Sequence, residues 1–532
     1  MAAWDRDTDV LVFGSGAAGM TAALVAAHAG CEVLLCEKSR LLGGTTAVSG
    51  GTVWTPGTRL AARAGIDDSP DAARRYLEAE IGPDARGLRA AFLESAAQAI
   101  DFLETHTDVH FRVANPYPDY HPALPGAVLA GRSLQPLPFD ARCLGDDFAR
   151  LRPPRPGFTI LGGMMVNRDE AALLVRPWRS RRAIAFTVRA LLRHARERLR
   201  YPRGARLLIG NALAGRFFQS LRRKGVTILF DARLESLVAT DGRVDGACVV
   251  VDGRRERVRA RRGVVLATGD GLDAATGIGA AIDDTGAGAA FWMPASVLRL
   301  PGRPELVFPH VIMDRARPGL IAVDTRGRRF VNEGDSYHDF VAAMFRANAI
   351  PAYLVCDRRF VRRYGIGAIR PVWQRLRPYI DAGYLIRGDT LQELAARAGI
   401  DAGELAATVA QHNRDAIDGV DTAFGKGGNP LNLMYGDPDV KPNPCLRPID
   451  HPPYFAVAVN PAIIGSSAGL ATDADARVLD TQGRPIERLV LDSSVPAFAR
   501  SDERRSPRSD DAPRAPIRDS HEQPRADEPP VA

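Results

Sequence analysis

The stretch Asp9-Val-Leu-Val-Phe-Gly14-Ser-Gly-Ala-Ala-Gly19 decides the fold of this chain. Residues 9–13 form an apolar run typical of a buried strand, and residues 20–28 are typical of a helix. Between them, the first glycine permits a tight turn and the second leaves room for a pyrophosphate against the backbone. The third glycine lets helix and strand pack closely, and the amino end of the helix would face the phosphates. The stretch therefore predicts the first turn of a dinucleotide-binding domain.

An acidic residue at the right distance supports this prediction. A second apolar strand, residues 32–35, ends at Cys36-Glu37. Glu37 lies where a carboxylate would accept hydrogen bonds from an adenosine ribose. A glycine motif alone is a weak signal, but an ordinary glycine-rich turn would not explain the acid. The combination of strand, helix and acid therefore predicts nucleotide binding.

The segments that follow favour FAD over NAD, which share the glycine fingerprint. Residues 38–54 are rich in glycine pairs and hydroxyls, a backbone that can lie flat against a large cofactor. Residues 263–269 read as a hydrophobic strand ending in Ala-Thr-Gly, preceded by a predicted β-ribbon over residues 225–252 with turns at Asp241-Gly242 and Asp252-Gly253. No second glycine motif follows a strand, so a separate NAD(P)H domain is not expected.

The composition is that of a globular protein of about two domains. The chain has 532 residues, of which 45% are hydrophobic and 25% charged, and this excludes fibrous, disulfide-scaffold and disordered classes. The net charge of +7 arises from 70 basic residues that are almost all arginine and form no dense run. We therefore expect no nucleic-acid partner.

The sequence also indicates the cellular compartment of the protein. The amino terminus lacks a basic region followed by an apolar stretch, and no run of about 18 apolar residues occurs. The 6 cysteines include no Cys-x-x-Cys pair, as expected for buried thiols in a reducing compartment. The sequence therefore predicts a cytoplasmic protein without a transmembrane segment.

Several motifs carry a resemblance to a known superfamily. Four segments resemble the flavoproteins of the fumarate reductase/succinate dehydrogenase superfamily: Gly14–Gly19, Gly43–Gly51, Ala267–Gly269 and Gly327–Glu333. A narrower resemblance, to the 3-ketosteroid Δ1-dehydrogenases, rests on eight further segments: Pro118–Pro122, Pro125–Gly126, Gly131–Ser133, Phe291–Ser296, Asn332–Phe340, Gly425–Pro430, Pro444–Leu446 and Gly469–Asp473.

The resemblance implies an α/β fold, in which a Rossmann-like FAD-binding domain of the GR2 type carries an inserted α+β catalytic cap domain. The expected order is a first FAD-domain piece, the cap, an altered second FAD-domain piece and a disordered tail: residues 1–285, 286–448, 449–499 and 500–532. Strand character typical of the FAD domain returns at residues 454–457 and 478–486. Residues 391–417 predict two helices of the cap.

The resemblance further implies a non-covalent FAD, because no histidine occurs between Lys38 and Leu60, where relatives with attached flavin carry one. The expected cofactor-binding residues belong to the glycine-rich and hydroxyl-rich motifs: Gly14, Ser15, Gly16, Ala17, Ala18, Gly19, Glu37, Lys38, Gly43, Gly44, Thr45, Thr46, Ser49, Gly50, Gly51, Ala267, Thr268 and Gly269. No metal is predicted, because four histidines lack metal-ligand spacing with other ligand side chains: His110, His121, His310 and His338.

Dehydrogenation beside a ketone needs a base for the α-proton, an acceptor for hydride and donors that polarise the ketone oxygen. By the resemblance, FAD N5 accepts the hydride and Tyr337 is the base, with Tyr120 as the phenol that stabilises or relays its proton. A phenol has a reference pKa of about 10, so it needs such a neighbour to act near neutrality. Tyr117 is the alternative to Tyr120, and Tyr117, Ser296 and His338 are expected to bind substrate. The expected partners are a small apolar ketone and an external electron acceptor.

One alternative is a fumarate reductase-like dicarboxylate oxidoreductase. Such an enzyme would use an arginine as proton donor and further polar side chains to clamp a dicarboxylate, and Arg328, Arg329 and His338 lie in the right region. The apolar segment Phe291-Trp-Met-Pro favours a large apolar ketone instead.

Another alternative is an inactive remnant with a frameshifted carboxyl terminus. Ala267-Thr-Gly-Asp-Gly271 fuses two motifs that relatives keep well apart. After Ile486 the chain departs from the carboxyl-terminal segment that supplies ketone donors and a helix end near the flavin in relatives. Residues 500–532 hold 6 prolines, 15 charged residues and no Phe, Tyr or Trp. That composition predicts disorder and fits a reading frame shifted near Ile486.

Overall fold

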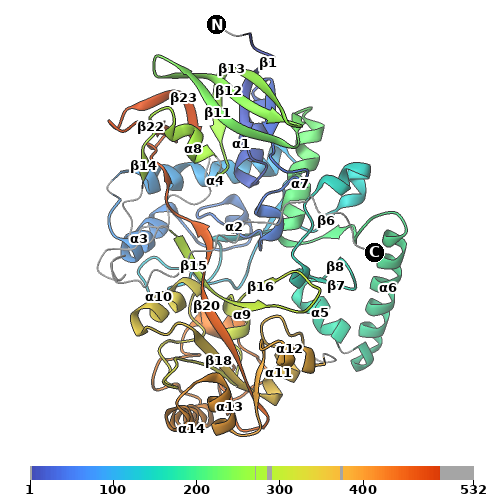
Figure 1. The fold of residues 1–532 in the computed structure, drawn as a ribbon, viewed down its shortest axis with the longest axis vertical. Coiled ribbons are helices and arrows are strands. Elements are labelled where there is room, and N and C mark those ends of the chain that lie inside the picture. Colours follow the sequence, from blue (N-terminus) through green and yellow to red (C-terminus); the bar gives the residue numbers. More distant parts are fainter. Residues whose placement is uncertain are drawn as a thin grey trace. The chain divides into compact units, whose positions relative to one another are not determined.

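The computed structural model describes residues 3–84, 86–175, 177–269, 271–283, 290–371 and 375–491. The tail predicted to be disordered, residues 500–532, lies outside the described residues. The chain divides into two compact units. Unit 1 comprises residues 1–285 and 468–498, and unit 2 is built on residues 286–467 (Figure 1).

An eight-stranded sheet forms the centre of unit 1. Its strands, in sheet order, are β10 (Thr227–Leu229), β2 (Val33–Cys36), β1 (Arg6–Phe13), β13 (Arg254–Leu266), β12 (Arg243–Val251), β23 (Pro485–Leu491) and β22 (Arg477–Leu479), with β11 (Ala232–Thr240) paired to β12. The pairs among β10, β2, β1 and β13 are parallel, as is the pair of β13 with β23.

Both faces of the parallel strands are buried, as their continuous apolar runs predict. Val12 of β1 belongs to the core cluster that includes residues of α1 (Ala17–His28) and α7 (Ile209–Arg223). Leu11 and Phe13 belong to a second cluster with residues of α8 (Gly271–Thr276). The alternation of neighbouring side chains between two cores fixes the register of β1 in the middle of the sheet.

The predicted β-ribbon is confirmed, with one difference. Asp241 and Gly242 have φ angles of 51° and 78°, and Asp252 and Gly253 have 49° and 78°, as two-residue hairpin turns require. The strand expected to begin at Gly263 instead begins at Arg254, because β13 is long enough to pair antiparallel with β12 and then parallel with β1.

Smaller elements complete unit 1. Its short strands are β3 (Val53–Trp54), β4 (Phe111–Val113), β5 (Ser133–Pro136), β6 (Phe139–Asp140), β7 (Thr159–Ile160), β8 (Met164–Met165), β9 (Arg206–Leu207), β14 (Ile282–Asp283) and β21 (Gly469–Leu470). Its further helices are α2 (Arg59–Arg63), α3 (Pro70–Ile81), α4 (Leu88–His106), α5 (Arg168–Val175) and α6 (Arg181–Arg198). The 3-10 turns are η1 (Thr46–Val48), η2 (Ala141–Arg150), η3 (Pro156–Phe158) and η4 (Pro177–Arg179).

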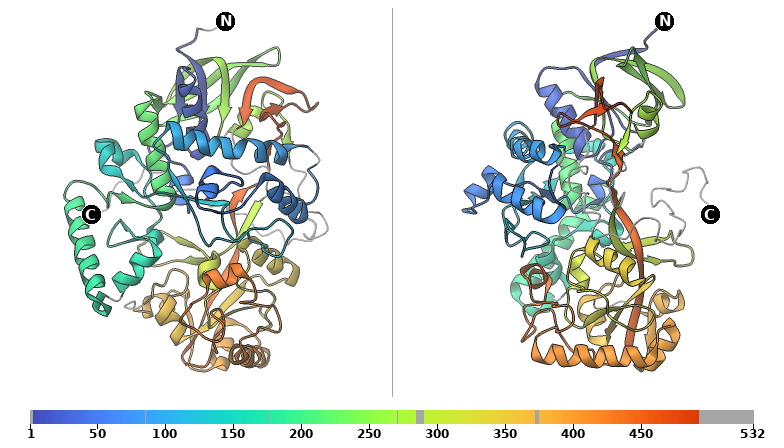
Figure 2. Two further views of the ribbon diagram at one scale, coloured as in Figure 1. Left: turned by 180° about the vertical axis from the view of Figure 1, so that it is seen from behind. Right: turned by 90° about the vertical axis from the view of Figure 1, so that its left-hand side faces the viewer.

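Unit 2 is built on a six-stranded sheet. Its strands, in sheet order, are β16 (Leu306–Pro309), β15 (Ala290–Leu298), β20 (Tyr454–Ser466), β18 (Ala352–Asp357) and β17 (Leu320–Val323), with β19 (Ile386–Gly388) paired to β20. The first half of β20 pairs with β18 and the second half with β15, and this long strand is visible in both views of Figure 2.

The chain returns to unit 1 later than expected. Residues 454–457 were predicted to rejoin the FAD domain, and the division instead falls at Ala468. The reason is that β20 holds the two halves of the unit 2 sheet together, a long-range pairing that an apolar run does not reveal.

Seven helices surround the unit 2 sheet in the described residues: α9 (Ile312–Arg315), α10 (Tyr337–Ala347), α11 (Arg358–Tyr364), α12 (Arg377–Asp381), α13 (Leu391–Ala398), α14 (Ala402–Asp418) and α15 (Pro430–Tyr435). The two helices expected over residues 391–417 are confirmed. The Thr390 hydroxyl accepts from the Glu393 amide at 3.1 Å and begins α13, whereas Gly399, with φ of 69°, ends it.

The fused motif after β13 leads directly into a helix. Leu266 ends β13, and Gly271 begins α8. Beside this end of β13, β23 pairs with residues 264–266 and buries Ile486 and Leu489. The chain therefore remains part of the core five residues beyond the position at which a shifted frame was suspected. Within the described ranges, no helix combines the length and apolarity that crossing a bilayer requires.

Candidate functional site: an FAD cradle and the catalytic side chains

The three glycines of the first turn have different surroundings. A Cβ on Gly14, where φ is +101°, would lie 2.5 Å from the Ala267 carbonyl oxygen, and one on Gly19 would lie 2.1 Å from the Gly14 oxygen. A Cβ on Gly16 would meet only the Thr46 hydroxyl, at 3.8 Å. The first and third glycines therefore allow the backbone to pack, and the second leaves open space at the amino end of α1.

Glu37 lies beside this turn at the end of β2. The residue is buried, with 5% of its surface exposed. One carboxylate oxygen accepts from the Ser15 amide at 3.1 Å and from the Ser15 hydroxyl at 2.5 Å, and the other accepts from the Ser39 amide at 3.0 Å. These bonds hold the carboxylate in place and leave it further lone pairs that can accept from ribose hydroxyls.

The glycine- and hydroxyl-rich segment folds against the same helix end. The Gly43 amide donates to the Ser15 hydroxyl at 3.0 Å, and the Thr46 hydroxyl accepts from the Ala17 amide at 2.9 Å. The Ser49 hydroxyl donates to the Thr46 carbonyl at 2.9 Å. The structure thus brings the predicted residues of the first turn and of residues 43–51 together around one helix end.

Two supporting residues were missed by the sequence reasoning. A Cβ on Gly210, at the start of α7, would lie 2.0 Å from the Thr46 carbonyl oxygen. Buried Asn211 donates to the carbonyls of Ala47 and Arg152 at 3.2 and 2.7 Å. An Asn within a run of small apolar residues was the available signal, but only the fold shows that it supports the loop.

The motif that ends β13 lies next to the first turn. The Ala267 amide donates to the Phe13 carbonyl at 2.9 Å, so the two strand ends are aligned. A Cβ on Gly269 would meet no atom within 4 Å. The open positions at Gly16 and Gly269, the helix end and the Glu37 carboxylate fit an FAD, whose pyrophosphate would be held at the amino end of α1 and whose ribose would be held by Glu37.

Tyr117 and Tyr120 lie in unit 1, on a loop held by a buried ion pair. Arg132, which is 1% exposed, donates to Asp68 at 2.9 Å and to Asp119 at 2.7 Å. Burial raises the pKa of the Asp119 carboxyl, and the Arg132 guanidinium opposes that rise. Both tyrosines are half-buried, so the loop presents them from a rigid base.

Tyr337 and His338 begin α10 in unit 2. The Ser336 hydroxyl accepts from the Asp339 amide at 3.1 Å and caps the helix, which makes Tyr337 its first residue. His338 accepts from the Trp292 amide at 3.3 Å through Nδ1 and packs edge-on against Phe291. Two predicted site residues and the apolar Phe291 segment are therefore neighbours, and Tyr337 is half-buried.

Ser296 is part of a buried chain of hydrogen bonds. Its hydroxyl lies 2.7 Å from His310 Nε2 and 2.7 Å from the Tyr384 hydroxyl, and His310 Nδ1 lies 2.5 Å from Asp314. The Ala368 amide donates to Tyr384 at 2.8 Å. Ser296 is 1% exposed and its hydroxyl has two partners within the protein, and its contact with substrate stays a prediction.

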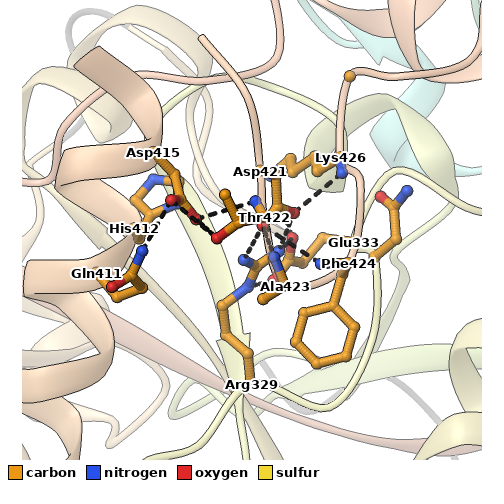
Figure 3. A network of polar contacts seen from close by, with 12 residues as sticks. Arg329, Glu333, Gln411, His412, Asp415, Asp421, Thr422, Ala423, Phe424 and Lys426 are labelled. Atoms are coloured by element: carbon orange, nitrogen blue, oxygen red, sulfur yellow. Dashed lines mark hydrogen bonds and ion pairs between the residues drawn. The ribbon is translucent and has the colours of Figure 1, made fainter. Parts of the chain in front are cut away.

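Arg329 forms hydrogen bonds and ion pairs within a buried network of polar side chains (Figure 3). It donates to Glu333 at 2.8 and 2.9 Å and to Asp421 at 2.8 Å, and Lys426 Nζ lies 3.5 Å from Glu333. Although burial favours the neutral acid, Arg329 and Lys426 hold the pKa of Glu333 below its usual range. Arg328 is paired with Glu404 at 2.9 Å. The arginines of the dicarboxylate alternative therefore already have carboxylate partners inside unit 2.

A small acidic cluster lies elsewhere in unit 2. Ligand atoms of Asp357, Asp450 and His451 lie within 4.8 Å of one another. The Arg359 guanidinium lies 3.5 Å from Asp357 and also pairs with Asp450. One guanidinium thus already pairs with both carboxylates of the cluster.

The family of FAD binding domains matches residues 9–269 and 267–489 of this chain. The match covers the cradle residues from Gly14 to Gly269 and extends three residues beyond Ile486. The chain belongs to this family of flavoproteins, and FAD is its cofactor.

The names of three relatives indicate which group of FAD-binding enzymes this chain resembles. The chain is 38% identical to 4-oxocyclohex-2-ene-1-carboxylate 5-dehydrogenase of Sinomonas cyclohexanicum, over 93% of this chain and 89% of that protein. It is 34% identical to 3-oxosteroid 1-dehydrogenase of Mycobacterium tuberculosis, over 92% of this chain and 93% of that protein. The crystal structure of 3-ketosteroid Δ1-dehydrogenase from Sterolibacterium denitrificans with 1,4-androstadiene-3,17-dione matches with a TM-score of 0.82 at 34% identity, covering 91% of this chain and 93% of that chain.

These relatives confirm the branch and the enzyme class predicted from the motifs. They are FAD-dependent dehydrogenases that act on CH–CH bonds, and the α/β flavoprotein fold is confirmed with them. A flavocytochrome c3 fumarate reductase at 21% identity, with a TM-score of 0.55, shares the fold.

The comparisons also bear on the fused motif. The two pieces of the family match overlap at residues 267–269. The alignment with the Sinomonas protein is 534 positions long although it takes in 93% of a 532-residue chain. That relative therefore carries residues that this chain lacks.

Proposed function

We propose that the protein catalyses the 1,2-dehydrogenation of a 3-ketosteroid or a similar cyclic ketone. Bound FAD supplies the hydride acceptor, at its N5 atom. Tyr337 removes the proton on the carbon next to the ketone, while the hydrogen on the neighbouring carbon leaves as hydride, so that a carbon–carbon double bond forms. The electrons then pass to an external acceptor.

The observation that carries this proposal is the position of Tyr337. It is the first residue of α10, and the amino end of a helix favours negative charge by about 0.3–1 kcal/mol. A phenolate is the form of tyrosine that can accept a proton. Because Ser336 caps the helix and His338 is held by Trp292, the first turn that carries Tyr337 is fixed on both sides.

We assign Tyr120 as the second phenol, which takes up or relays the proton held by Tyr337, with Tyr117 as its alternative. The buried pair of Arg132 with Asp119 holds the loop that carries both. His338 and Tyr117 are proposed to contact the substrate, and the apolar side chain of Phe291 fits an apolar ring system.

A second substrate class is favoured by one observation. The identity of 38% to a dehydrogenase of a small cyclic keto acid exceeds the 34% to a steroid dehydrogenase. A cyclohexanone carboxylate is therefore the second candidate, and the same chemistry at the ketone would serve it.

The test begins with the flavin absorption of the purified full chain. Under anaerobic conditions, bleaching by 4-androstene-3,17-dione would support the steroid, and bleaching by 4-oxocyclohexanecarboxylate alone would select the smaller ketone. Bleaching by succinate alone would overturn the proposal in favour of the dicarboxylate enzyme. If the purified protein is colourless and binds no added FAD, the chain is an inactive remnant of such an enzyme.

The residue assignment needs a variant that keeps the flavin. Tyr337→Phe should retain the flavin spectrum and lower the rate of bleaching by about 10²–10⁴-fold, the usual contribution of a general base. Tyr353→Phe, a half-buried tyrosine of β18, is the matched control and should bleach at the unaltered rate. Normal bleaching by Tyr337→Phe would exclude Tyr337 as the base.

A further inference from the structure

Arg315, the last residue of α9, is a buried cation without an acidic partner of its own. None of its surface is exposed, and among the residues that the structure describes no carboxylate forms an ion pair with it. Burial lowers the pKa of Arg315 to about 10, although nearby carboxylates, Asp314 foremost, act in the opposite direction. A buried charge without a counter-ion costs free energy, and the contacts of the guanidinium indicate what this charge is used for.

The donors of Arg315 go to main-chain carbonyl groups. Nε donates to the His310 carbonyl at 3.0 Å, and the two terminal nitrogens donate to the carbonyls of Glu333 and Asp335 at 2.6 and 3.2 Å. The sheet of unit 2 holds His310 in turn, because its amide donates to the Pro294 carbonyl of β15 at 2.9 Å. The planar fork of the guanidinium thus ties the segment just before α10 to the sheet.

The guanidinium also packs against α10. Its central carbon lies 4.6 Å from the centroid of the Phe340 ring, which is a cation–π contact, and Phe340 is fully buried. The Phe340 amide donates to the Ser336 carbonyl at 3.0 Å and so belongs to the first turn of the helix. Tyr337 lies between the points that Arg315 holds, two residues after Asp335 and three before Phe340.

The turn before α10 has further contacts of its own. A Cβ on Gly334 would lie 2.7 Å from Cγ of Asn432, and Asn432 donates to the Asp335 carboxylate at 3.3 Å. The Gly334 amide donates to the Asn332 side chain at 2.9 Å. These contacts shape the turn at Gly334, and Arg315 joins that turn to the first turn of α10.

We propose that Arg315 is a positioning residue, which holds Tyr337 at the place from which it removes the proton of the ketone substrate. This inference rests on the proposed function, in which Tyr337 is the base. A general base must lie within hydrogen-bond reach of its proton, and a displacement of about 1 Å can cost about 100-fold in rate. Because Arg315 is fully buried, it acts on Tyr337 through the main chain and the Phe340 ring.

A packing role alone would have a different consequence. A buried charged group can often be replaced by an apolar side chain of similar volume at little cost in stability. If Arg315 only filled space, Arg315→Met would therefore react like the parent protein. If Arg315 positions Tyr337, the same change leaves the carbonyls of Glu333 and Asp335 without their donors, and the reaction slows.

The test measures flavin bleaching in single turnovers of the full chain. The substrate is whichever of 4-androstene-3,17-dione and 4-oxocyclohexanecarboxylate bleaches the parent. Arg315→Met should keep the flavin and lower the bleaching rate at saturating ketone by about 10- to 100-fold, whereas the ketone concentration for half of the maximal rate should change by less than about threefold. Arg315→Lys keeps the cation but lacks the fork, so its rate should lie between those of the parent and Arg315→Met.

A double variant separates positioning from a general loss of structure. If Arg315 acts through Tyr337, Arg315→Met should lower the rate by less than about twofold when Tyr337→Phe is already present. A general loss of structure would lower the rate by the same factor in both backgrounds. If Arg315→Met loses its flavin or unfolds, the same comparison is made with Arg315→Lys.

Arg216 of α7 provides a matched control in unit 1. It donates to the carbonyls of Leu137, Asp108 and Pro138 at 3.0, 2.6 and 2.7 Å, and its guanidinium lies 5.7 Å from the centroid of the Phe139 ring. Burial lowers the pKa of Arg216 as well. Arg216→Met removes the same kinds of contact, so it should lower the unfolding temperature and leave the bleaching rate unchanged.

Three results would overturn the role of Arg315 alone. These are a parental rate in Arg315→Met while Tyr337→Phe is slow, equal factors in the two backgrounds, and a slowing by Arg216→Met as large as that by Arg315→Met. A parental rate in Tyr337→Phe, or a parent that neither ketone bleaches, would instead overturn the proposed function, and the role of Arg315 with it. The two failures are therefore distinguishable.

Discussion

The Ser15 hydroxyl donates to a Glu37 carboxylate oxygen at 2.5 Å and accepts from the Gly43 amide at 3.0 Å. One small side chain thus joins the glycine turn, the acid at the end of β2 and the segment that follows it. The carboxylate is buried and is held by amide and hydroxyl donors. The carboxylate proposed to bind the ribose is therefore held in place by donors of the protein itself.

Glu37→Gln should weaken FAD binding. The amide keeps the shape but loses the charge, and hydrogen bonds to a charged acceptor contribute about 1.5–3 kcal/mol, so the dissociation constant should rise by about 10- to 100-fold. Titration of the apoprotein with FAD, followed by flavin fluorescence, measures this change. Glu32→Gln, an exposed acid with 65% of its side-chain surface accessible, is the control. An unchanged dissociation constant in Glu37→Gln would remove the carboxylate from the cofactor site.

Alanine at Gly16 and at Gly19 should have separable effects. A methyl group at Gly16 enters open space, so Gly16→Ala should fold normally and lose flavin. At Gly19 the methyl group would lie 2.1 Å from the Gly14 oxygen, so Gly19→Ala should lower the unfolding temperature even without flavin. Gly403→Ala, whose methyl group meets nothing closer than 3.5 Å, is the control. The same loss of stability in both variants would show that Gly16 also has a packing role.

His412 should make the protein less stable in mild acid. Burial, with repulsion from Lys426 and Arg329, lowers its pKa to about 4. Nε2 donates to the Arg447 carbonyl at 3.1 Å, and buried Nδ1 has no partner among the described residues. As pH falls from 6.5 towards 4, the unfolded chain binds a proton that the folded chain does not. The free energy of unfolding should therefore fall by about 3 kcal/mol over that range.

The measurement for His412 is urea unfolding between pH 7 and pH 4.5. His412→Gln keeps a donor for the Arg447 carbonyl and removes the titration, so its free energy of unfolding should depend less steeply on pH than that of the parent. His451→Gln, whose side chain is 45% exposed, should keep the parental slope. Equal slopes in parent and His412→Gln would mean that His412 titrates freely in the folded state.

Arg132→Met should destabilise the loop that carries Tyr117 and Tyr120. The side chains of Arg132, Asp68 and Asp119 are 1, 0 and 3% exposed, so the change leaves two buried carboxylates without their cation. Removing one partner of a buried pair costs about 3–5 kcal/mol of unfolding free energy. Chemical denaturation measures the loss, and limited proteolysis locates it. Arg74→Met, an exposed partner of Asp71, should cost under about 1 kcal/mol, and a similar effect of the two changes would contradict the role given to Arg132.

The sequence by itself determined the class of this protein. The strand, glycine turn and helix of residues 6–28, the acid at Glu37 and the hairpin turns at Asp241 and Asp252 depend on neighbouring residues. Hydrogen bonding and φ preferences act over a few residues, so such features can be read from the chain. The family motifs then led to FAD and to a dehydrogenase, which the relatives confirm.

Only the tertiary structure decided how distant segments combine. β20 joins β15 to β18 and keeps residues 454–466 in unit 2, and Asn211 supports the Ala47 carbonyl across 164 positions. Ser296 is buried, and its hydroxyl lies within hydrogen-bond distance of His310 and Tyr384, which are far from it in the sequence. Arg329 likewise pairs with Glu333 and with Asp421, which lies 92 positions away in the sequence. Partners so far apart in sequence are selected by packing and by the burial of charge, which no local pattern records.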